Sequence, residues 1–218
     1  MNKILMGVAL ILSAICGGCT TQYQPMGVDP STGYLGSTGS NTVPYTKAAV
    51  SLTLKTDLGK YQGSILVSGS GILASEDPFL LKEMAAIGAF SDGMDIVSLQ
   101  QRLITAGVQD KVPETHDLLG LNKAYRAYKP FLWVHFELVS DQGECSVAMI
   151  ATDPGDGQDL FKANAHVRSS PGVGDGCDSF SINTTDDQGT WYPLFNSFID
   201  WATANGAKVK LSQVGAKS

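Results

Sequence analysis

The sequence predicts an α+β domain in which an antiparallel-rich sheet has helices packed on one face. Two observations indicate this class. Helix-like segments gather between an early pair of strand-like segments and a later run of three, and the later run has the alternation of a β-meander. Strands and helices grouped in this way are typical of α+β folds. With 43% hydrophobic residues, the chain can also build one core of ordinary size.

The first strands are predicted at residues 49–54 and 64–68, which are rich in β-branched and apolar residues. The helices are predicted from their boundaries. An Asp-Pro pair is typical of a helix start, a glycine of a helix end, and a residue before proline avoids the helical region. By these signs, helices run from Asp77 towards Gly88, then over residues 95–106, 114–128 and 191–205.

Residues 131–140 form the clearest predicted strand, since apolar and polar residues alternate along it. Residues 145–152 return beside it, and a two-residue loop at 142–143 would pair Leu138 with Val147. Residues 160–168 form the third strand of this meander. One face carries Leu132, Val134, Phe136 and Leu138, and the other carries Trp133, His135, Glu137 and Val139.

The N-terminus combines one basic residue, Lys3, with an apolar run over residues 4–15 and small residues after it. The run is too short to cross about 30 Å of hydrocarbon as a helix, so the pattern is typical of a secretory signal peptide. Gly17-Gly18-Cys19 resembles the end of the lipobox of bacterial lipoprotein precursors, although Cys16 stands where that family has an aliphatic residue. The resemblance implies that Cys19 becomes the acylated (palmitate-type) first residue of the mature chain.

Thr20 follows Cys19 where an aspartate would stand in retained lipoproteins, so the resemblance also implies a location at the periplasmic face of the outer membrane. A cut by ordinary signal peptidase, giving a soluble periplasmic protein, is the alternative. Residues 20–46 are rich in Gly, Pro, Ser and Thr and predict a flexible tether, with a root-mean-square span of about 30 Å. We therefore expect a signal peptide at 1–18, a lipid-anchored tether at 19–46, one domain at 47–206, and a tail or short edge strand at 207–218.

Lys3 is the only charged residue among residues 1–18, so its removal takes the formal net charge from −6 to −7. Nucleic-acid binders need a cationic face, so this acidic chain is not expected to bind nucleic acid. The membrane is expected to be contacted only through the N-terminal anchor. The remaining cysteines, Cys145 and Cys177, predict a disulfide in an exported chain, and a buried thiol with a free loop thiol is the alternative.

Two sequence patterns are partly similar to known ligand-binding motifs. Residues 69–74, GSGILA, fit a dinucleotide fingerprint, but the helix begins only at Asp77, so a strand end with a glycine bulge is the better interpretation. Aspartates also gather in loops and allow a Ca²⁺ site, although they fail the EF-hand spacing and solvated turns explain them. These are Asp153, Asp156, Asp159, Asp175, Asp178, Asp186 and Asp187.

The outward face of the meander carries the candidate binding residues. Trp133, His135 and Glu137 lie on the first strand, and a strand about 9–10 Å away carries Lys162, Asn164, His166 and Arg168. Tryptophan and arginine are enriched at interface hot spots, so Trp133, His135, Glu137 and Arg168 form the predicted partner-binding set. A plain solvated sheet face is the alternative. No metal, cofactor or catalytic residue is predicted.

These observations favour a non-enzymatic, membrane-anchored envelope lipoprotein that acts as an interaction or assembly module with an envelope protein partner. A periplasmic module for glycan or small ligands, with Trp133 or Trp191 as a stacking platform, is the alternative. A hydrolase with an unrecognised site is a third possibility, against which the three histidines and the absence of a known nucleophile motif both count.

Overall fold

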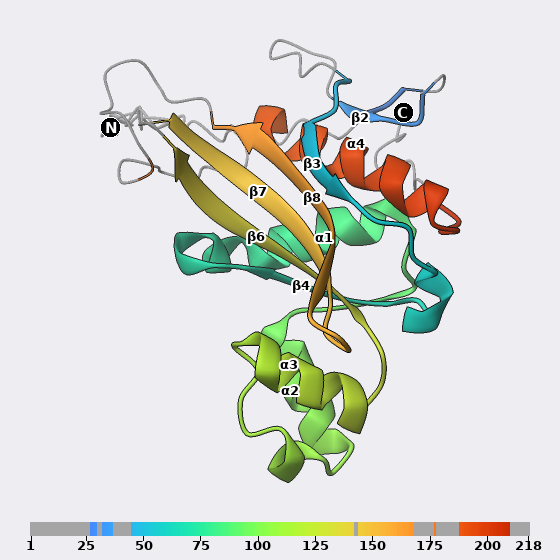
Figure 1. Ribbon diagram of the computed structural model, residues 1–218, viewed down its shortest axis with the longest axis vertical. Coiled ribbons are helices and arrows are strands. Elements are labelled where there is room, and N and C mark those ends of the chain that lie inside the picture. The colour runs from blue at the N-terminus through green and yellow to red at the C-terminus, as the bar shows by residue number, and fades with distance from the viewer. Residues whose placement is uncertain are drawn as a thin grey trace, which may run out of the picture.

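The computed structural model describes residues 27–29, 32–36, 45–141, 144–167, 177 and 188–209. A six-stranded sheet in the order β3-β8-β7-β6-β4-β5 forms the centre of the domain (Figure 1). The strands β3, β8, β7 and β6 are antiparallel neighbours, and β6, β4 and β5 run parallel. The sheet strands are β3 Ala49–Thr53, β4 Ser64–Gly69, β5 Asp92–Met94, β6 Leu132–Asp141, β7 Glu144–Asp153 and β8 Gln158–His166.

Within the described residues, four α-helices pack against this sheet, which confirms the predicted α+β class. They are α1 Asp77–Ile87, α2 Ile96–Thr105, α3 Leu118–Ala127 and α4 Gln188–Ala204, and short 3₁₀ segments lie at Leu58–Tyr61, Gly71–Glu76 and Gln109–Lys111. Two helices begin where an aspartate caps them: Asp95 accepts a hydrogen bond from the Ser98 amide, and Asp117 accepts one from the Gly120 amide. The second cap explains why α3 begins at Leu118 rather than at the predicted residue 114. No helix within the described ranges is both long and apolar enough to cross a bilayer.

The main core lies between one face of the sheet and the helices α1 and α4 (Figure 1). Phe161 of β8 packs against Phe198 and Trp201 of α4, and Phe136 of β6 packs against Trp191 and Phe195. All of these rings are buried. The inward residues of the predicted meander therefore form the core that the alternation indicated.

A second, smaller core lies at the β4–β5 edge, where α2 and α3 pack against Leu66 and Met94. Leu66 alternates along β4 with Ile65 and Val67, which belong to the main core, so the second core uses the opposite face of the sheet. Helices therefore cover both faces of the sheet, rather than the one face that the sequence predicted. Trp133 packs against this second core because it lies beside Leu66 in the parallel pairing of β4 and β6.

The β6–β7 hairpin has the register that the sequence predicted, with Leu138 opposite Val147 and Val139 opposite Ser146. An even loop keeps the apolar residues of both strands on one face, whereas an odd loop would have buried Ser146. The strand β7 also separates β6 from β8, as the meander required.

The segment GSGILA is a strand end followed by a 3₁₀ turn. The Gly69 amide donates a hydrogen bond to the Asp77 carboxylate, and a Cβ at Gly69 would lie 2.3 Å from the Leu73 carbonyl oxygen. Gly71 has φ +58°, which favours glycine. Tight chain packing therefore accounts for these glycines, and the α-helix begins only at Asp77, as expected.

The prediction of a flexible tether over residues 19–46 does not hold at residues 27–28 and 35–36, where the chain forms paired strands. The short strands β1 Gly27–Val28 and β2 Leu35–Gly36 pair with each other, and Leu35 is fully buried against α4. Composition did not reveal this contact because the residue that holds Leu35, Asn196, lies 161 positions away. Ala207–Val209 form no strand, and the rest of the predicted tail or edge strand lies outside the described residues, as do Cys16 and Cys19.

Candidate functional site

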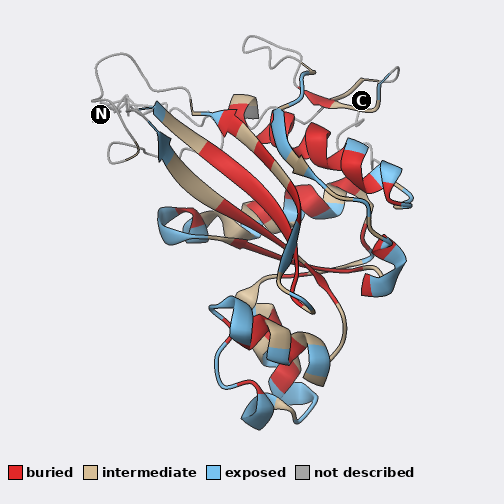
Figure 2. Ribbon diagram, in the orientation of Figure 1, coloured by how far each residue is buried: buried red, intermediate tan, exposed pale blue. Residues whose placement is uncertain are grey.

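The outward surface of β6, β7 and β8, which we call the polar face, carries the predicted site residues. Alternation places Trp133, His135, Glu137 and Val139 of β6 on it, beside Ser146 and Thr152 of β7 and Lys162, Asn164 and His166 of β8. Burial changes along this face, from buried near the second core to intermediate and exposed toward the β6–β7 hairpin (Figure 2). We call these two parts the closed end and the open end.

Two stacked aromatic rings dominate the closed end. The rings of Trp133 and His135 lie 4.0 Å apart at 16° to each other, and the Trp133 indole donates to Ser68 Oγ at 2.9 Å. Because i and i+2 side chains share one face of a strand, the two rings are neighbours that can stack. Trp133 is half-buried and His135 is only 9% exposed. Both rings lie on the predicted outward face, but neither is fully open to solvent.

His135 belongs to a chain of polar contacts. Thr152 donates its hydroxyl proton to Asp159 Oδ1 at 2.7 Å, so its oxygen accepts the bond from His135 Nε2 at 3.2 Å. This pattern assigns the ring proton to Nε2. The other nitrogen, Nδ1, lies 3.4 Å from Glu137 Oε1.

Burial lowers the pKa of His135, although the neighbouring Glu137 and Asp159 carboxylates act in the opposite direction. Burial therefore favours the neutral form of the imidazole over the charged form. The His135 ring is buried and bonded through Nε2, so it is positioned as part of the fold. Its Nδ1 faces Glu137, whose side chain is 42% exposed.

The open end is a depression of about 500 Å³ on the surface. None of its lining residues is buried, and they supply both charge signs, an amide, a hydroxyl and one aliphatic side chain. Within it, His166 Nδ1 lies 3.6 Å from Glu144 Oε2, and both side chains are largely exposed. The lining residues are Val139, Asp141, Glu144, Ser146, Lys162, Asn164 and His166.

The depression is lined by residues of β8 and by residues of the β6–β7 hairpin. The outward positions of Lys162, Asn164 and His166 on one strand follow from alternation, whereas Asp141 and Glu144 flank the predicted loop at 142–143. Their pairing across the hairpin, with Asp141 opposite Glu144, is what places them at the site. Arg168 lies outside the described residues.

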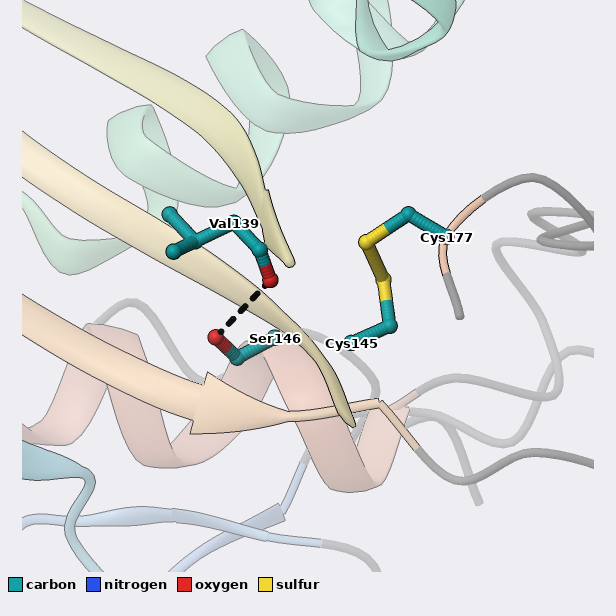
Figure 3. The surroundings of a disulfide bond; sticks show 4 residues. All are labelled: Val139, Cys145, Ser146 and Cys177. Carbon is teal, nitrogen blue, oxygen red and sulfur yellow. Dashed lines mark hydrogen bonds between the residues drawn. A yellow bond between two sulfur atoms is a disulfide. The ribbon is translucent and has the colours of Figure 1, made fainter. Parts of the chain in front are cut away.

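A disulfide joins Cys145 to Cys177, with the two Cα atoms 5.0 Å apart (Figure 3). Cys145 stands between Glu144 and Ser146 on β7, and Ser146 Oγ donates a hydrogen bond to the Val139 carbonyl in the same view. The bond therefore attaches a distant part of the chain to the strand that lines the open end.

The described aspartates of the suspected Ca²⁺ loops are engaged locally. Asp153 pairs with Lys60 and accepts from the Gly155 amide, Asp156 accepts from the Gln158 amide, and Asp159 accepts from Thr152. Across the described ranges, no three His, Cys, Asp or Glu residues come together as metal ligands. Asp175, Asp178, Asp186 and Asp187 lie outside those ranges.

The glycan-binding alternative loses one of its two platforms. Trp191 is fully buried, with its ring against Phe79 and Phe136 in the main core, so its proposed role as an exposed stacking surface is wrong. Trp133 keeps some exposure, but His135 covers one face of its indole.

No protein-family model matches the chain, and no curated protein matches it closely enough to count as a relative. Among solved structures, it is similar to the LpoB C-terminal domain from Escherichia coli, with 13% identity over 49% of this chain and 82% of that one, at a TM-score of 0.33. It is also similar to lipoprotein GNA1162 from Neisseria meningitidis, with 13% identity over 66% of this chain and 98% of that one, at a TM-score of 0.32.

A third similar structure is the PelC L103M dodecamer from Paraburkholderia phytofirmans, with 11% identity over 71% of this chain and 93% of that one, at a TM-score of 0.28. Likenesses this distant carry no functional weight for this chain. Its function must be inferred from its own residues.

Proposed function

We propose that this chain is a non-enzymatic envelope lipoprotein, anchored by Cys19 to the periplasmic face of the outer membrane, whose polar face docks an envelope protein partner. The observation that supports docking is the open end: a depression of about 500 Å³ whose seven lining residues are all accessible and chemically mixed. The predicted set of Trp133, His135, Glu137 and Arg168 stays part of the proposal. The open end adds the residues that a partner can reach most easily.

The chemistry of the open end suits a protein partner better than a small ligand. Small-molecule sites are concave and enclose most of the ligand among apolar side chains. Here Val139 is the one aliphatic lining residue, and Asp141, Glu144 and Lys162 offer charges of both signs. Mixed exposed charges fix the orientation and register of a protein partner more than they supply affinity.

The closed end supports the open end instead of competing with it. Trp133 and His135 are packed against each other and against the second core, so β6 is held rigidly where the partner surface begins. Glu137 marks the boundary, since its carboxylate reaches His135 but its side chain is 42% exposed. A rigid strand that presents an accessible polar end costs little ordering entropy on binding.

A lipid anchor would strengthen such docking, because a tethered domain meets neighbouring envelope proteins at a raised effective concentration. Replacing Cys19 with Ser is expected to abolish fatty-acid labelling and to release the chain into the soluble periplasm. Labelling that survives Cys19→Ser and disappears with Cys16→Ser would assign the anchor to Cys16. Equal labelling in both variants would contradict a lipid anchor at this motif.

The docking proposal is tested by affinity capture from envelope extracts with the full chain and two charge-reversal variants. Lys162→Glu lies in the open end, and Lys111→Glu lies on an exposed 3₁₀ turn away from the sheet. We expect Lys162→Glu to reduce partner yield at least fivefold, whereas Lys111→Glu should retain it. Arg168→Ala belongs in the same series, since Arg168 is one of the predicted docking residues. Full yield from both Lys162→Glu and Arg168→Ala would overturn the proposal.

A further inference from the structure

We infer that the surface of α4 around Asn196 is a binding site for an extended Tyr-Leu-Gly peptide, and that this chain occupies the site with its own residues 34–36. The inference is independent of the polar face, because the site lies on the helix that covers the other face of the sheet. It rests on three sets of contacts, to the peptide backbone, to the leucine side chain and to the flanking residues.

Asn196 holds the backbone of Leu35 from both sides. Its Oδ1 accepts from the Leu35 amide at 2.6 Å, and its Nδ2 donates to the Leu35 carbonyl at 2.9 Å and to the Thr46 carbonyl at 2.7 Å. Asn196 is fully buried. If the segment left, the Asn196 side chain would lose all three hydrogen bonds, and water could not replace them while the side chain stayed buried. A carboxamide bonded to both backbone groups of one residue recognises an extended chain in the way a neighbouring strand does.

The Leu35 side chain fills an apolar position that α4 and the sheet provide. Leu35 is 0% exposed and belongs to the main core, although the segment around it is otherwise polar and glycine-rich. A single buried leucine on a short strand pair is an anchor of the kind that peptide grooves use, with backbone contacts for affinity and one pocket for specificity.

The flanking positions add selectivity for tyrosine and glycine. The Tyr34 hydroxyl donates to the Asp200 carboxylate, with its oxygen 2.8 and 3.0 Å from the two carboxylate oxygens, and Lys47 pairs with the same carboxylate at 2.9 Å. A Cβ at Gly36 would lie 2.6 Å from the Tyr45 ring, so only glycine fits there without displacing that ring. Both contacts depend on residues outside the strand pair itself.

Other side chains of α4, and that of Asn205 just after it, also form hydrogen bonds to the main chain of residues 48–56. Ser197 donates to the Ala48 carbonyl, Trp201 Nε1 donates to the Leu54 carbonyl, and Asn205 Oδ1 accepts from the Thr56 amide. One helix therefore bonds to the main chain of a long N-terminal segment through side chains. The Leu35 contact is the part of this row that lies beyond the sheet, so its release would leave β3 paired with β8.

A peptide with the sequence of residues 27–36 should therefore bind in trans when the site is vacated. The probe is that ten-residue peptide with a fluorescent label, titrated against the full chain carrying Leu35→Ser and against the unaltered chain. The covalently attached segment acts at an effective concentration of the order of 1 mM, so a peptide of about 0.1 mM affinity should bind the unaltered chain about tenfold more weakly.

Altered peptides provide matched controls that do not depend on the folding of a protein variant. Substituting serine for the leucine of the peptide should abolish binding, methylating the leucine amide should do the same because Asn196 Oδ1 loses its donor, and phenylalanine for the tyrosine should weaken binding several-fold. If Leu35→Ser fails to fold, the amide hydrogen exchange of Leu35 in the unaltered chain replaces it, and slow exchange that accelerates on adding excess peptide supports the site.

Equal binding of the original and serine peptides would overturn the inference, as would a Leu35 amide that exchanges as fast as a free peptide. Binding of the peptide that is undiminished by an Asn196→Leu substitution in a chain that remains folded would also overturn it.

Discussion

The two ends of the polar face share one strand pattern but differ in what surrounds them. Along β6 every second residue points outward, yet His135 is buried, Trp133 and Val139 are half-buried, and Asp141 at the hairpin is exposed. At the closed end, α2 and α3 and the β4 strand supply neighbours for the outward residues. At the open end the hairpin extends past β4, so its outward residues meet solvent (Figure 1).

This difference teaches that alternation assigns a residue to a face of the sheet, whereas the elements packed over that face decide how exposed the residue is. A tryptophan followed two residues later by a histidine would therefore have a different role at each end of such a face. Over a covered part of the sheet the pair stabilises the fold, and over an uncovered part it would offer a hot spot. Function on this face is accordingly expected where cover is missing.

The largest expected change in unfolding free energy comes from removing the disulfide next to the open end. A chain with both Cys145→Ser and Cys177→Ser is expected to lose about 3–4 kcal/mol of unfolding free energy, because the bond closes a loop of 32 residues in the unfolded chain. Urea unfolding at neutral pH measures it. A loss below about 1 kcal/mol would show that the bond does not constrain this end.

Trp133→Ala tests the closed end and should have the next largest effect. Removing a fully buried tryptophan costs about 3–5 kcal/mol, so a half-buried one with a stacking partner and a hydrogen bond should cost about 2 kcal/mol. Val139→Ala, on the same strand and face at the open end, is the control and should cost less than about 1 kcal/mol. Equal losses in the two variants would remove the distinction between the ends.

The buried state of His135 predicts how stability depends on pH. Burial lowers its pKa in the folded chain, so below the unfolded value of about 6.5 the unfolded chain binds a proton that the folded chain resists. The stability that His135 contributes should therefore be present above pH 6.5 and fall as the pH drops below it, until the folded residue is protonated as well. Urea unfolding of the wild type and His135→Gln at pH 7.5 and 5 measures it.

Four groups face His135: Glu137, Asp159, Thr152 and Lys162. The carboxylates of Glu137 and Asp159 favour the protonated ring and could reverse this pH dependence. If the ion pair with Glu137 outweighed burial, the wild type would gain stability relative to His135→Gln as the pH fell. That result would make the closed end a charged site.

The smallest effect on stability is expected from the open end. Asn164→Ala and Lys162→Glu change accessible side chains, and such changes usually alter the unfolding free energy by less than about 0.5 kcal/mol. Thermal unfolding checks this. A larger loss would mean that the depression is part of the packed structure.

Much of the fold could be predicted because it depends on local patterns. The alternation of β6, the two-residue loop that pairs Leu138 with Val147, and the Asp95 cap are all encoded within a few residues of where they act. The three-residue strand β5 was missed, since Asp92–Met94 has no alternation to recognise and pairs only because β4 lies beside it. Trp191 was misjudged because its ring packs against Phe79 and Phe136, which lie more than 50 residues earlier in the chain.

The candidate site was predictable in part for the same reason. Lys162, Asn164 and His166 could be placed on one face from their spacing alone. The burial of His135 and the contact of Leu35 with Asn196 depend on partners far away in the sequence, which no local pattern reports. Distance along the chain, more than chemistry, separates what was found from what was missed.

The central claim is that the open end of the polar face contacts a partner protein in the cell envelope. The most direct measurement places a photoreactive amino acid at His166 in the full chain, with Lys111 as an equally exposed position away from the face. On irradiation of intact cells, we predict a discrete protein adduct from position 166 and none from position 111. An adduct from position 111 with none from position 166, or the same adducts from both, would contradict the claim.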